Sequence, residues 1–196
     1  MVPNDAPPTT STSPKTSPPS SEARSDQGSR VNVEQLTEAT ADVRGDYRYV
    51  LTRTWDSAAE PVVFVMLNPS TADATVDDRT VRRCIWFAKR EGFGGIIVVN
   101  LYAYRATNPR VMFAAEDPVG PANDAIIAEH TRGRTVIAAW SYHAEPARTE
   151  QVLELLSEAA AVFVLGLTKH GHPRHPLYVR GEAPLAPWPQ PTSRVS

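Results

Sequence analysis

Four short apolar runs, rich in valine and isoleucine, dominate the central part of this 196-residue chain. They occupy residues 62–67, 96–99, 136–139 and 162–167. Segments of helix length separate the runs, and this alternation is typical of buried parallel strands joined by helical crossovers. The sequence therefore predicts a three-layer α/β/α sandwich with a central, mainly parallel four-stranded sheet.

The segments between the runs predict one further strand and the helices. Residues 47–54 alternate in polarity, which predicts an added antiparallel or edge strand with Arg48 and Arg53 facing outward. Asp77 or Asp78 suits the N-cap of a helix over about 79–91. The remaining expected helices are 121–130, 146–159 and, with a weaker pattern, 33–41.

Composition divides the chain into one domain and two tails. Residues 1–29 are rich in proline, serine and threonine and cannot bury enough apolar surface to offset chain entropy, so we expect a disordered tail. Residues 30–182 then form a single α/β domain. Repeated prolines predict an extended tail over 183–196, in which Trp188 is the residue suited to contact the domain.

Several classes of protein are excluded or disfavoured. The chain has no secretory signal and no run of about 20 apolar residues, so we expect a cytoplasmic protein without a membrane partner. Its only cysteine, Cys84, excludes an internal disulfide and is expected to be a buried core thiol. Ser141 lacks the glycine-flanked nucleophile elbow, and no glycine motif precedes a helix, so no nucleotide cofactor is expected.

Polar residues follow each apolar run. Because an open α/β sheet binds ligands at the carboxyl ends of its parallel strands, these residues are expected to face one crevice. They are Asn68-Pro69-Ser70, Asn100, Trp140-Ser141-Tyr142-His143 and the histidine-rich segment 169–176.

Two asparagines at these strand ends allow two interpretations each. An Asn-Pro pair turns the chain sharply, so Asn68 either faces a ligand or shapes an ordinary turn. An amide directly after a buried strand needs hydrogen-bond partners. Asn100 can therefore read the edge of a nucleobase, since it donates and accepts at once, or it can bond to a neighbouring loop.

The remaining polar clusters also leave alternatives open. Asp73 and its neighbours Asp77 and Asp78 could bind a divalent cation, although helix capping and solvation explain them as well. His170, His172 and His175 could form a metal site with Asp73. The alternative is a loop that aims one neutral imidazole at a developing negative charge.

Residues 47–180 resemble the family called domain of unknown function 1643. The resemblance rests on three segments, 67–73 (Leu-Asn-Pro-Ser-Thr-Ala-Asp), 100–107 (Asn-Leu-Tyr-Ala-Tyr-Arg-Ala-Thr) and 171–178 (Gly-His-Pro-Arg-His-Pro-Leu-Tyr). The order of the strand ends is also similar to that of the uracil-DNA glycosylase superfamily. Arg174 adds one residue to the last loop, which leaves two registers, one with His172 and one with His175.

The superfamily resemblance implies roles for individual residues. Asn68 would orient the attacking water, Asn100 would read the base, His172 would stabilise the departing base, and Leu177 would wedge into the space that the base leaves. The other residues that we expect to contact the substrate are Pro69, Ser70, Asp73, Arg105, Trp140, Arg174 and His175.

Three functions follow as hypotheses. The first is a uracil-DNA-glycosylase-like protein that binds a nucleobase in nucleic acid or nucleotide and hydrolyses an N-glycosidic bond. The second is a non-catalytic nucleic-acid or nucleotide-binding module of the same fold. The third is a metal-dependent hydrolase built on His170, His172 and His175, whereas the first two need no metal or other cofactor.

Overall fold

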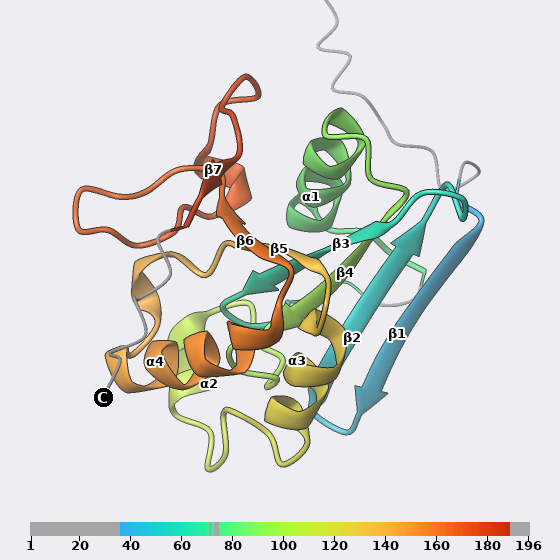
Figure 1. Cartoon of the computed structure of the whole chain (residues 1–196). Helices are drawn as coiled ribbons and strands as arrows, with labels where there is room; N and C mark the ends of the chain where they lie inside the picture. Colours follow the sequence, from blue (N-terminus) through green and yellow to red (C-terminus); the bar gives the residue numbers. More distant parts are fainter. Residues whose placement is uncertain (1–35, 71, 73–74, 189–196) are drawn as a thin grey trace, which may run out of the picture. The chain divides into compact units, whose positions relative to one another are not determined.

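A computed structural model describes residues 36–70, 72 and 75–188. Within these residues the sheet has seven strands in the order β1-β2-β4-β3-β5-β6-β7 (Figure 1). The four apolar runs form β3 (Pro61–Met66), β4 (Gly95–Asn100), β5 (Thr135–Ala138) and β6 (Ala161–Val164). Neighbouring strands among these four are parallel.

The sheet is wider than the expected four strands. On one side β2 (Tyr47–Thr54) pairs antiparallel with β4, and β1 (Glu38–Arg44) pairs antiparallel with β2. On the other side β7 (Ala186–Pro187) pairs antiparallel with β6. The α/β class is thus confirmed, but the sheet is mixed, and its parallel strands lie in the middle.

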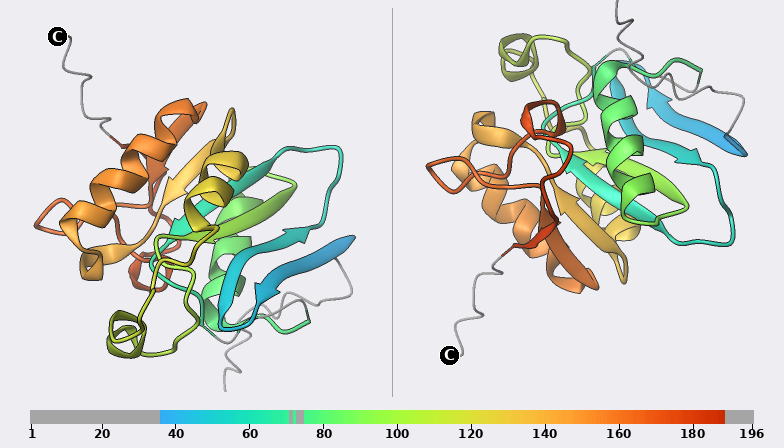
Figure 2. Two further views of the ribbon diagram at one scale, coloured as in Figure 1. Left: turned by 90° about the horizontal axis from the view of Figure 1, so that it is seen from below. Right: turned by 90° about the horizontal axis from the view of Figure 1, so that it is seen from above.

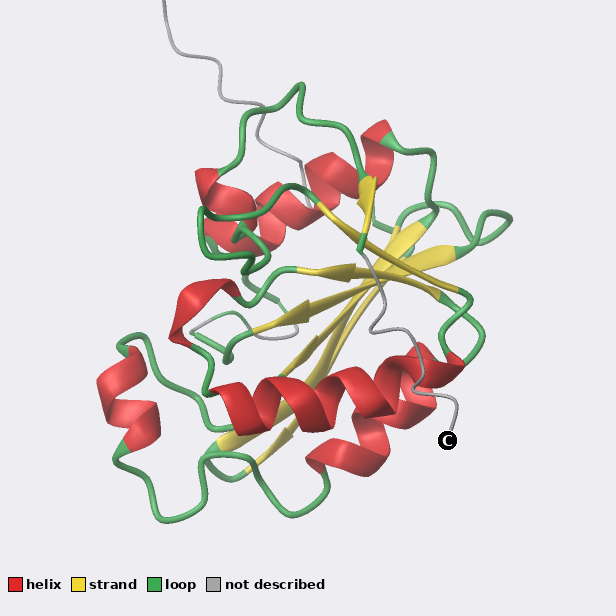
Figure 3. Ribbon diagram, turned by 60° about the vertical axis from the view of Figure 1, so that its left-hand side comes forward, coloured by secondary structure: helices red, strands yellow, loops and turns green. Residues whose placement is uncertain are grey.

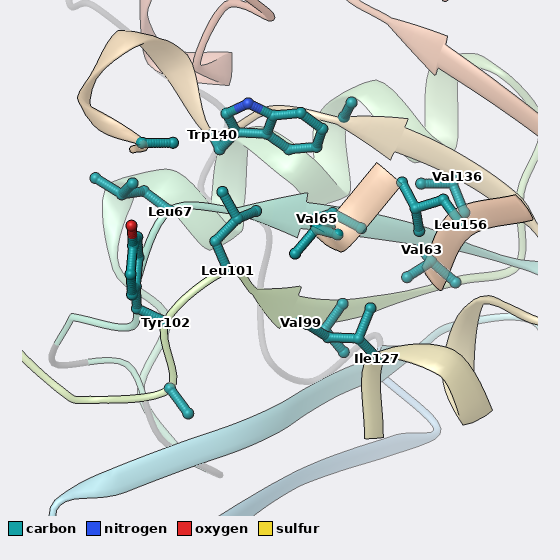
Figure 4. Close-up of a cluster of buried hydrophobic side chains, with 14 of the residues drawn as sticks. Val63, Val65, Leu67, Val99, Leu101, Tyr102, Ile127, Val136, Trp140 and Leu156 are labelled. Atoms are coloured by element: carbon teal, nitrogen blue, oxygen red, sulfur yellow. The ribbon is translucent and has the colours of Figure 1, made fainter. Parts of the chain in front are cut away.

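Helices cover both faces of the sheet (Figures 2 and 3). The helix α1 (Arg79–Arg90) packs on one face, where Phe64 and Ile85 belong to the same buried cluster. The helices α3 (Asn123–Thr131) and α4 (Pro146–Leu155) pack on the other face. Figure 4 shows that cluster, in which Val65 lies on the sheet and Ile127 on α3. The strands β3, β4 and β5 are buried on both faces, which explains their unbroken apolar sequences.

Side-chain caps fix where two helices begin. The Asp78 carboxylate accepts a hydrogen bond from the Val81 backbone N–H at 2.8 Å, so Asp78 is the N-cap of α1. Asn108 caps the short α2 (Pro109–Phe113) in the same way. The helix α3 begins two residues after the expected Pro121, and α4 ends at Leu155, where a 3₁₀ turn (Leu156–Glu158) continues the chain.

The expected helix over 33–41 is wrong where the structure describes it. Residues 33–35 lie outside the described part, and Glu38–Arg44 form β1 instead. The chain turns at Gly45, whose φ of 59° suits glycine, and returns as β2. Pairing with β2 therefore overrides a weak local preference for helix.

The outward orientation expected for Arg48 and Arg53 is also wrong, because both side chains are buried. A register shift opposite Tyr49 disturbs the alternation of β2. The segment between β3 and α1 also covers the face on which these arginines lie. Arg48 donates to the Ala72 carbonyl at 2.6 Å, and Arg53 contacts the Asp77 carboxylate at 2.8 Å.

The two expected tails differ in what the structure describes. Residues 1–29 and 189–196 lie outside the described part, so their expected disorder stays a prediction. Trp188 does contact the domain: its ring lies 5.1 Å from that of Trp140, and its backbone N–H donates to the Val162 carbonyl. Cys84 is fully buried, as expected, and burial raises its thiol pKa. No helix among the described residues is long and apolar enough to cross a membrane.

Candidate functional site

A pocket of about 540 Å³ lies at the carboxyl ends of the parallel strands. Its volume is in the range of small-molecule sites. The ends of three strands line it, with Asn68 following β3, Asn100 ending β4 and Trp140 following β5. His175, from the loop after β6, completes the set. The strand ends that the sequence placed at one crevice therefore do meet in space.

Asn100 lies at the buried end of β4 with 1 % of its surface exposed. Its side-chain Nδ2 is buried and has no hydrogen-bond partner among the described residues. Its backbone carbonyl accepts a hydrogen bond from Asn123 at 3.0 Å, which fixes the end of the strand. An unpaired buried donor costs about 1–3 kcal/mol, so this amide is better explained by a ligand than by packing.

Trp140, which also lines this pocket, carries a second buried donor. Its indole Nε1 has no partner in the described chain, and its ring lies within the core cluster (Figure 4). Ser141 follows with a φ of 67°, a left-handed conformation that costs a non-glycine residue about 1–3 kcal/mol. The Ser141 N–H donates to the Pro173 carbonyl at 2.9 Å and so holds this strained corner against the last loop.

The Asn68 side chain joins two neighbouring loops. Its Nδ2 donates to the Ala106 carbonyl at 2.7 Å and to the Pro69 carbonyl at 3.1 Å. The Ala106 N–H donates in turn to the Pro69 carbonyl at 2.9 Å. The amide nitrogen is therefore used within the protein, and Oδ1 is the atom that can face a ligand or a water molecule.

His175, and not His172, lines the pocket. The Leu177 N–H donates to His175 Nδ1 at 3.3 Å, so a neutral ring carries its proton on Nε2. Burial lowers the pKa of His175, while the charge of Asp78 opposes that shift. His172 lies in the preceding turn, where its N–H and carbonyl both bond to Thr168.

One cation and one carboxylate set the charge of the pocket wall. Arg48 is 3 % exposed and lines the pocket, which places a permanent positive charge there. Asp78 is the acidic residue among the lining residues, and both its oxygens are engaged, by the Ser70 hydroxyl and by the Val81 N–H. The buried donors Asn100 Nδ2 and Trp140 Nε1 have no acceptor among the described residues, and the site favours an acceptor-rich ligand.

Two tyrosines form the rim of the pocket. Tyr142 is 62 % exposed and Tyr178 is 75 % exposed, although both line the pocket. The Tyr178 ring lies 5.7 Å from that of His175. Exposed aromatic faces of this kind can stack on planar ligands. Tyr142 stands in the polar segment that the sequence pointed to, whereas nothing in the pattern of β2 indicated Arg48.

Several expected site residues lie elsewhere. Leu177 and Arg174 are exposed and do not line the pocket, and the Arg174 Nε bonds to the Leu167 carbonyl. Pro69 is buried at the turn after β3. Arg105 lines a neighbouring pocket that shares Ser70 with the first. Asp73 lies outside the described residues.

The three histidines of the last loop are not arranged as a metal site. Within the described ranges, no group of three or more His, Cys, Asp or Glu side chains is placed to hold a metal ion. The metal-dependent alternative therefore loses its geometric support from His170, His172 and His175.

The fold and the pocket define a mixed α/β protein with convergent polar groups at the carboxyl ends of its parallel strands. The chain belongs to the family described as Protein of unknown function (DUF1643), whose model matches residues 48–177. The match spans β2 to the last pocket-lining loop. Among curated proteins, no significant match to the chain is found.

Proposed function

We propose that this protein binds a nucleobase, within nucleic acid or a nucleotide, in the pocket at the strand ends and hydrolyses the N-glycosidic bond of that nucleotide. The observation that carries the proposal is that Asn100 and Trp140 both line this pocket and each carries a buried donor, Nδ2 and Nε1, without a partner among the described residues. Nucleobases offer carbonyl oxygens and ring nitrogens as acceptors to such donors. We also propose that the protein acts in the cytoplasm, as expected from the sequence.

His175 replaces His172 as the residue that stabilises the departing base. Breaking a glycosidic bond develops negative charge on the base, and a neutral imidazole with its proton on Nε2 can donate to that charge. The bond from Leu177 to Nδ1 selects this tautomer. The positive charge of Arg48, which is buried and lines the same pocket, also stabilises the negative charge of the departing base.

Asn68 contributes through orientation. Its fixed Nδ2 leaves Oδ1 to accept a hydrogen bond from water and to direct that water at the sugar. Leu177, 37 % exposed beside the pocket-lining Tyr178, supplies an apolar side chain that can occupy the space of an extruded base.

The test is cleavage of labelled oligonucleotides, single-stranded and duplex, that contain uracil, hypoxanthine or a mismatch, followed by alkaline scission at abasic sites. We expect cleavage of at least one substrate. Asn100→Ala and His175→Ala should each lower its rate by about 100-fold or more, because each removes a donor that acts on the departing base.

His172→Ala is the matched control, since this histidine belongs to the same loop but does not line the pocket. It should leave the rate within about two-fold of the wild type. Folding of every variant is checked by thermal unfolding. A folded wild-type protein that neither cleaves nor binds any of the oligonucleotides would remove the proposal.

One observation favours a second candidate, the non-catalytic binding module. Asp78 is the carboxylate among the described pocket-lining residues, and both its oxygens are already bonded. If Asn68 orients the water, that water is held by an amide, which cannot take up a proton. Tight binding without turnover, lost in Asn100→Ala and kept in Asn68→Ala, would favour this module over the hydrolase.

A further inference from the structure

A second, smaller pocket of about 290 Å³ adjoins the first. Ser70, Ala106 and Thr107 line both pockets, so the two are adjacent. The residues lining only the smaller one are Gly45 and Asp46, from the turn between β1 and β2, and Arg105.

The Arg105 guanidinium has no partner within the described chain. Its Nε is buried without a hydrogen bond, and no ion pair joins its side chain to a described carboxylate. A guanidinium presents several donors in a planar fork that matches the oxygens of a phosphate. A partly exposed guanidinium whose Nε is buried without a partner in the described chain is explained by an anionic ligand.

The backbone around Arg105 is held on both sides. The Arg105 N–H donates to the Asp46 carbonyl at 2.9 Å, and the Ala106 N–H donates to the Pro69 carbonyl at 2.9 Å. Asn68 Nδ2 also donates to the Ala106 carbonyl at 2.7 Å. Asn68, which lines the first pocket, thereby fixes the segment 105–107, which lines the second.

Asp46 is the group that opposes an anion in this pocket. Its side chain is exposed, so its charge acts through a solvent of high dielectric constant, whereas the Arg105 Nε is buried. The arginine should therefore determine the sign of the ligand, and the aspartate should only weaken its binding.

We propose that the pocket of Arg105 binds the phosphate ester that flanks the nucleobase held in the first pocket. This inference rests on the proposed function and narrows its substrate to a phosphate-bearing nucleotide, free or within a strand. A nucleoside, which lacks the phosphate, fills only the first pocket.

The experiment compares the affinities of the full-length protein for deoxynucleosides, including deoxyuridine, and for their 5′- and 3′-monophosphates by calorimetry. At least one monophosphate should bind about ten-fold or more tightly than its nucleoside. Arg105→Gln should reduce this ratio to about one, with the affinity for the nucleoside unchanged. Asp46→Asn should increase the ratio, which a merely structural role for Arg105 would not predict.

Arg132→Gln is the control for a lost surface charge, because Arg132 is exposed and paired with Glu158. It should keep the wild-type ratio. Short single strands with a neutral methylphosphonate on either side of the base then separate the sources of the phosphate. If the preference for phosphate is seen only with strands, the bound phosphate belongs to nucleic acid. If it is also seen with monophosphates, the bound phosphate can come from a free nucleotide.

The outcomes also separate the two proposals. If nucleosides and nucleotides bind equally well and the methylphosphonates leave the affinity for strands unchanged, or if Arg105→Gln keeps the preference for phosphate, the phosphate site is overturned and nucleobase binding stands. If no nucleoside, nucleotide or strand binds the folded protein, both proposals fail.

Discussion

His175 has its tautomer and its charge set by separate contacts. The Leu177 N–H bonds to Nδ1, and burial lowers the pKa of the imidazole below its ordinary value of 6.5. At neutral pH the ring is therefore uncharged, with its proton on Nε2. Sequence alone could not decide whether His172 or His175 lines the pocket. The answer depends on which residues form the turn at Thr168–Gly171, and His172 is bonded within that turn.

The lowered pKa of His175 predicts a dependence of stability on pH. The unfolded chain binds a proton at the ordinary pKa and the folded chain binds it only at a lower one. The stability gained from a neutral His175 is thus fully present above pH 6.5 and is lost as the pH falls through the lowered value. In urea titrations between pH 7.5 and 5, the free energy of unfolding should fall less in His175→Gln than in the wild type.

His170→Gln provides the comparison for this measurement, because His170 is exposed in the same loop. Its pH dependence should follow that of the wild type. His130, whose pKa burial also lowers, is present in both variants and cancels in the comparison. The same decline in His175→Gln and in the wild type would contradict the assignment of a partly buried, neutral ring.

At the scale of elements, β2 shows what alternation can and cannot predict. The strand itself was predictable from its β-branched and aromatic residues. The direction of Arg48 and Arg53 was not, because it depends on a register shift at Tyr49 and on a covering segment that comes later in the chain. Arg48 could therefore be recognised as a pocket residue only from the structure.

The pair Arg53–Asp77 ties β2 to the segment that leads into α1. The closest N–O distance is 2.8 Å, and the side chains are 1 % and 9 % exposed. Asp77→Ala would leave a buried guanidinium without this carboxylate. We expect the free energy of unfolding to fall by about 3–5 kcal/mol, measured by urea denaturation.

The exposed pair Arg132–Glu158 gives a matched control. Its side chains are 66 % and 65 % exposed at a distance of 2.6 Å. Glu158→Ala should cost less than about 1 kcal/mol, since solvent screens such pairs. If the two substitutions cost the same, burial of the Arg53 pair would not be what stabilises this connection.

For the whole molecule, the strands that the sequence predicted best are the four in the centre. Three of them, β3, β4 and β5, are buried on both faces, so their composition alone distinguishes them. The outer strands β1 and β7 have weaker sequence patterns. Their conformation depends on pairing with β2 and β6, which the local sequence does not reveal. The same contrast holds for the site: Asn68, Asn100 and Trp140 follow central strands and meet as expected, whereas the last loop needed its register from the structure.

The last described strand, β7, forms one edge of the sheet beside β6. After β7 the Trp188 ring lies 5.1 Å from the Trp140 ring at an angle of 36°, and the Trp188 N–H bonds to the Val162 carbonyl at 2.8 Å. Trp140 is thus supported by a residue 48 positions later in the chain. The position of its Nε1 in the pocket should depend on this contact.

Replacing Trp188 tests that dependence. Trp188→Ala should lower the free energy of unfolding by about 1–3 kcal/mol, because a half-buried ring and an aromatic pair are lost. Trp140 would gain contact with water, so the fluorescence of the remaining tryptophans should shift to longer wavelength. Trp188→Phe keeps an aromatic ring and should retain most of the stability and the emission. An unchanged emission and an unchanged unfolding midpoint in Trp188→Ala would mean that the rest of the core holds Trp140 in place without β7.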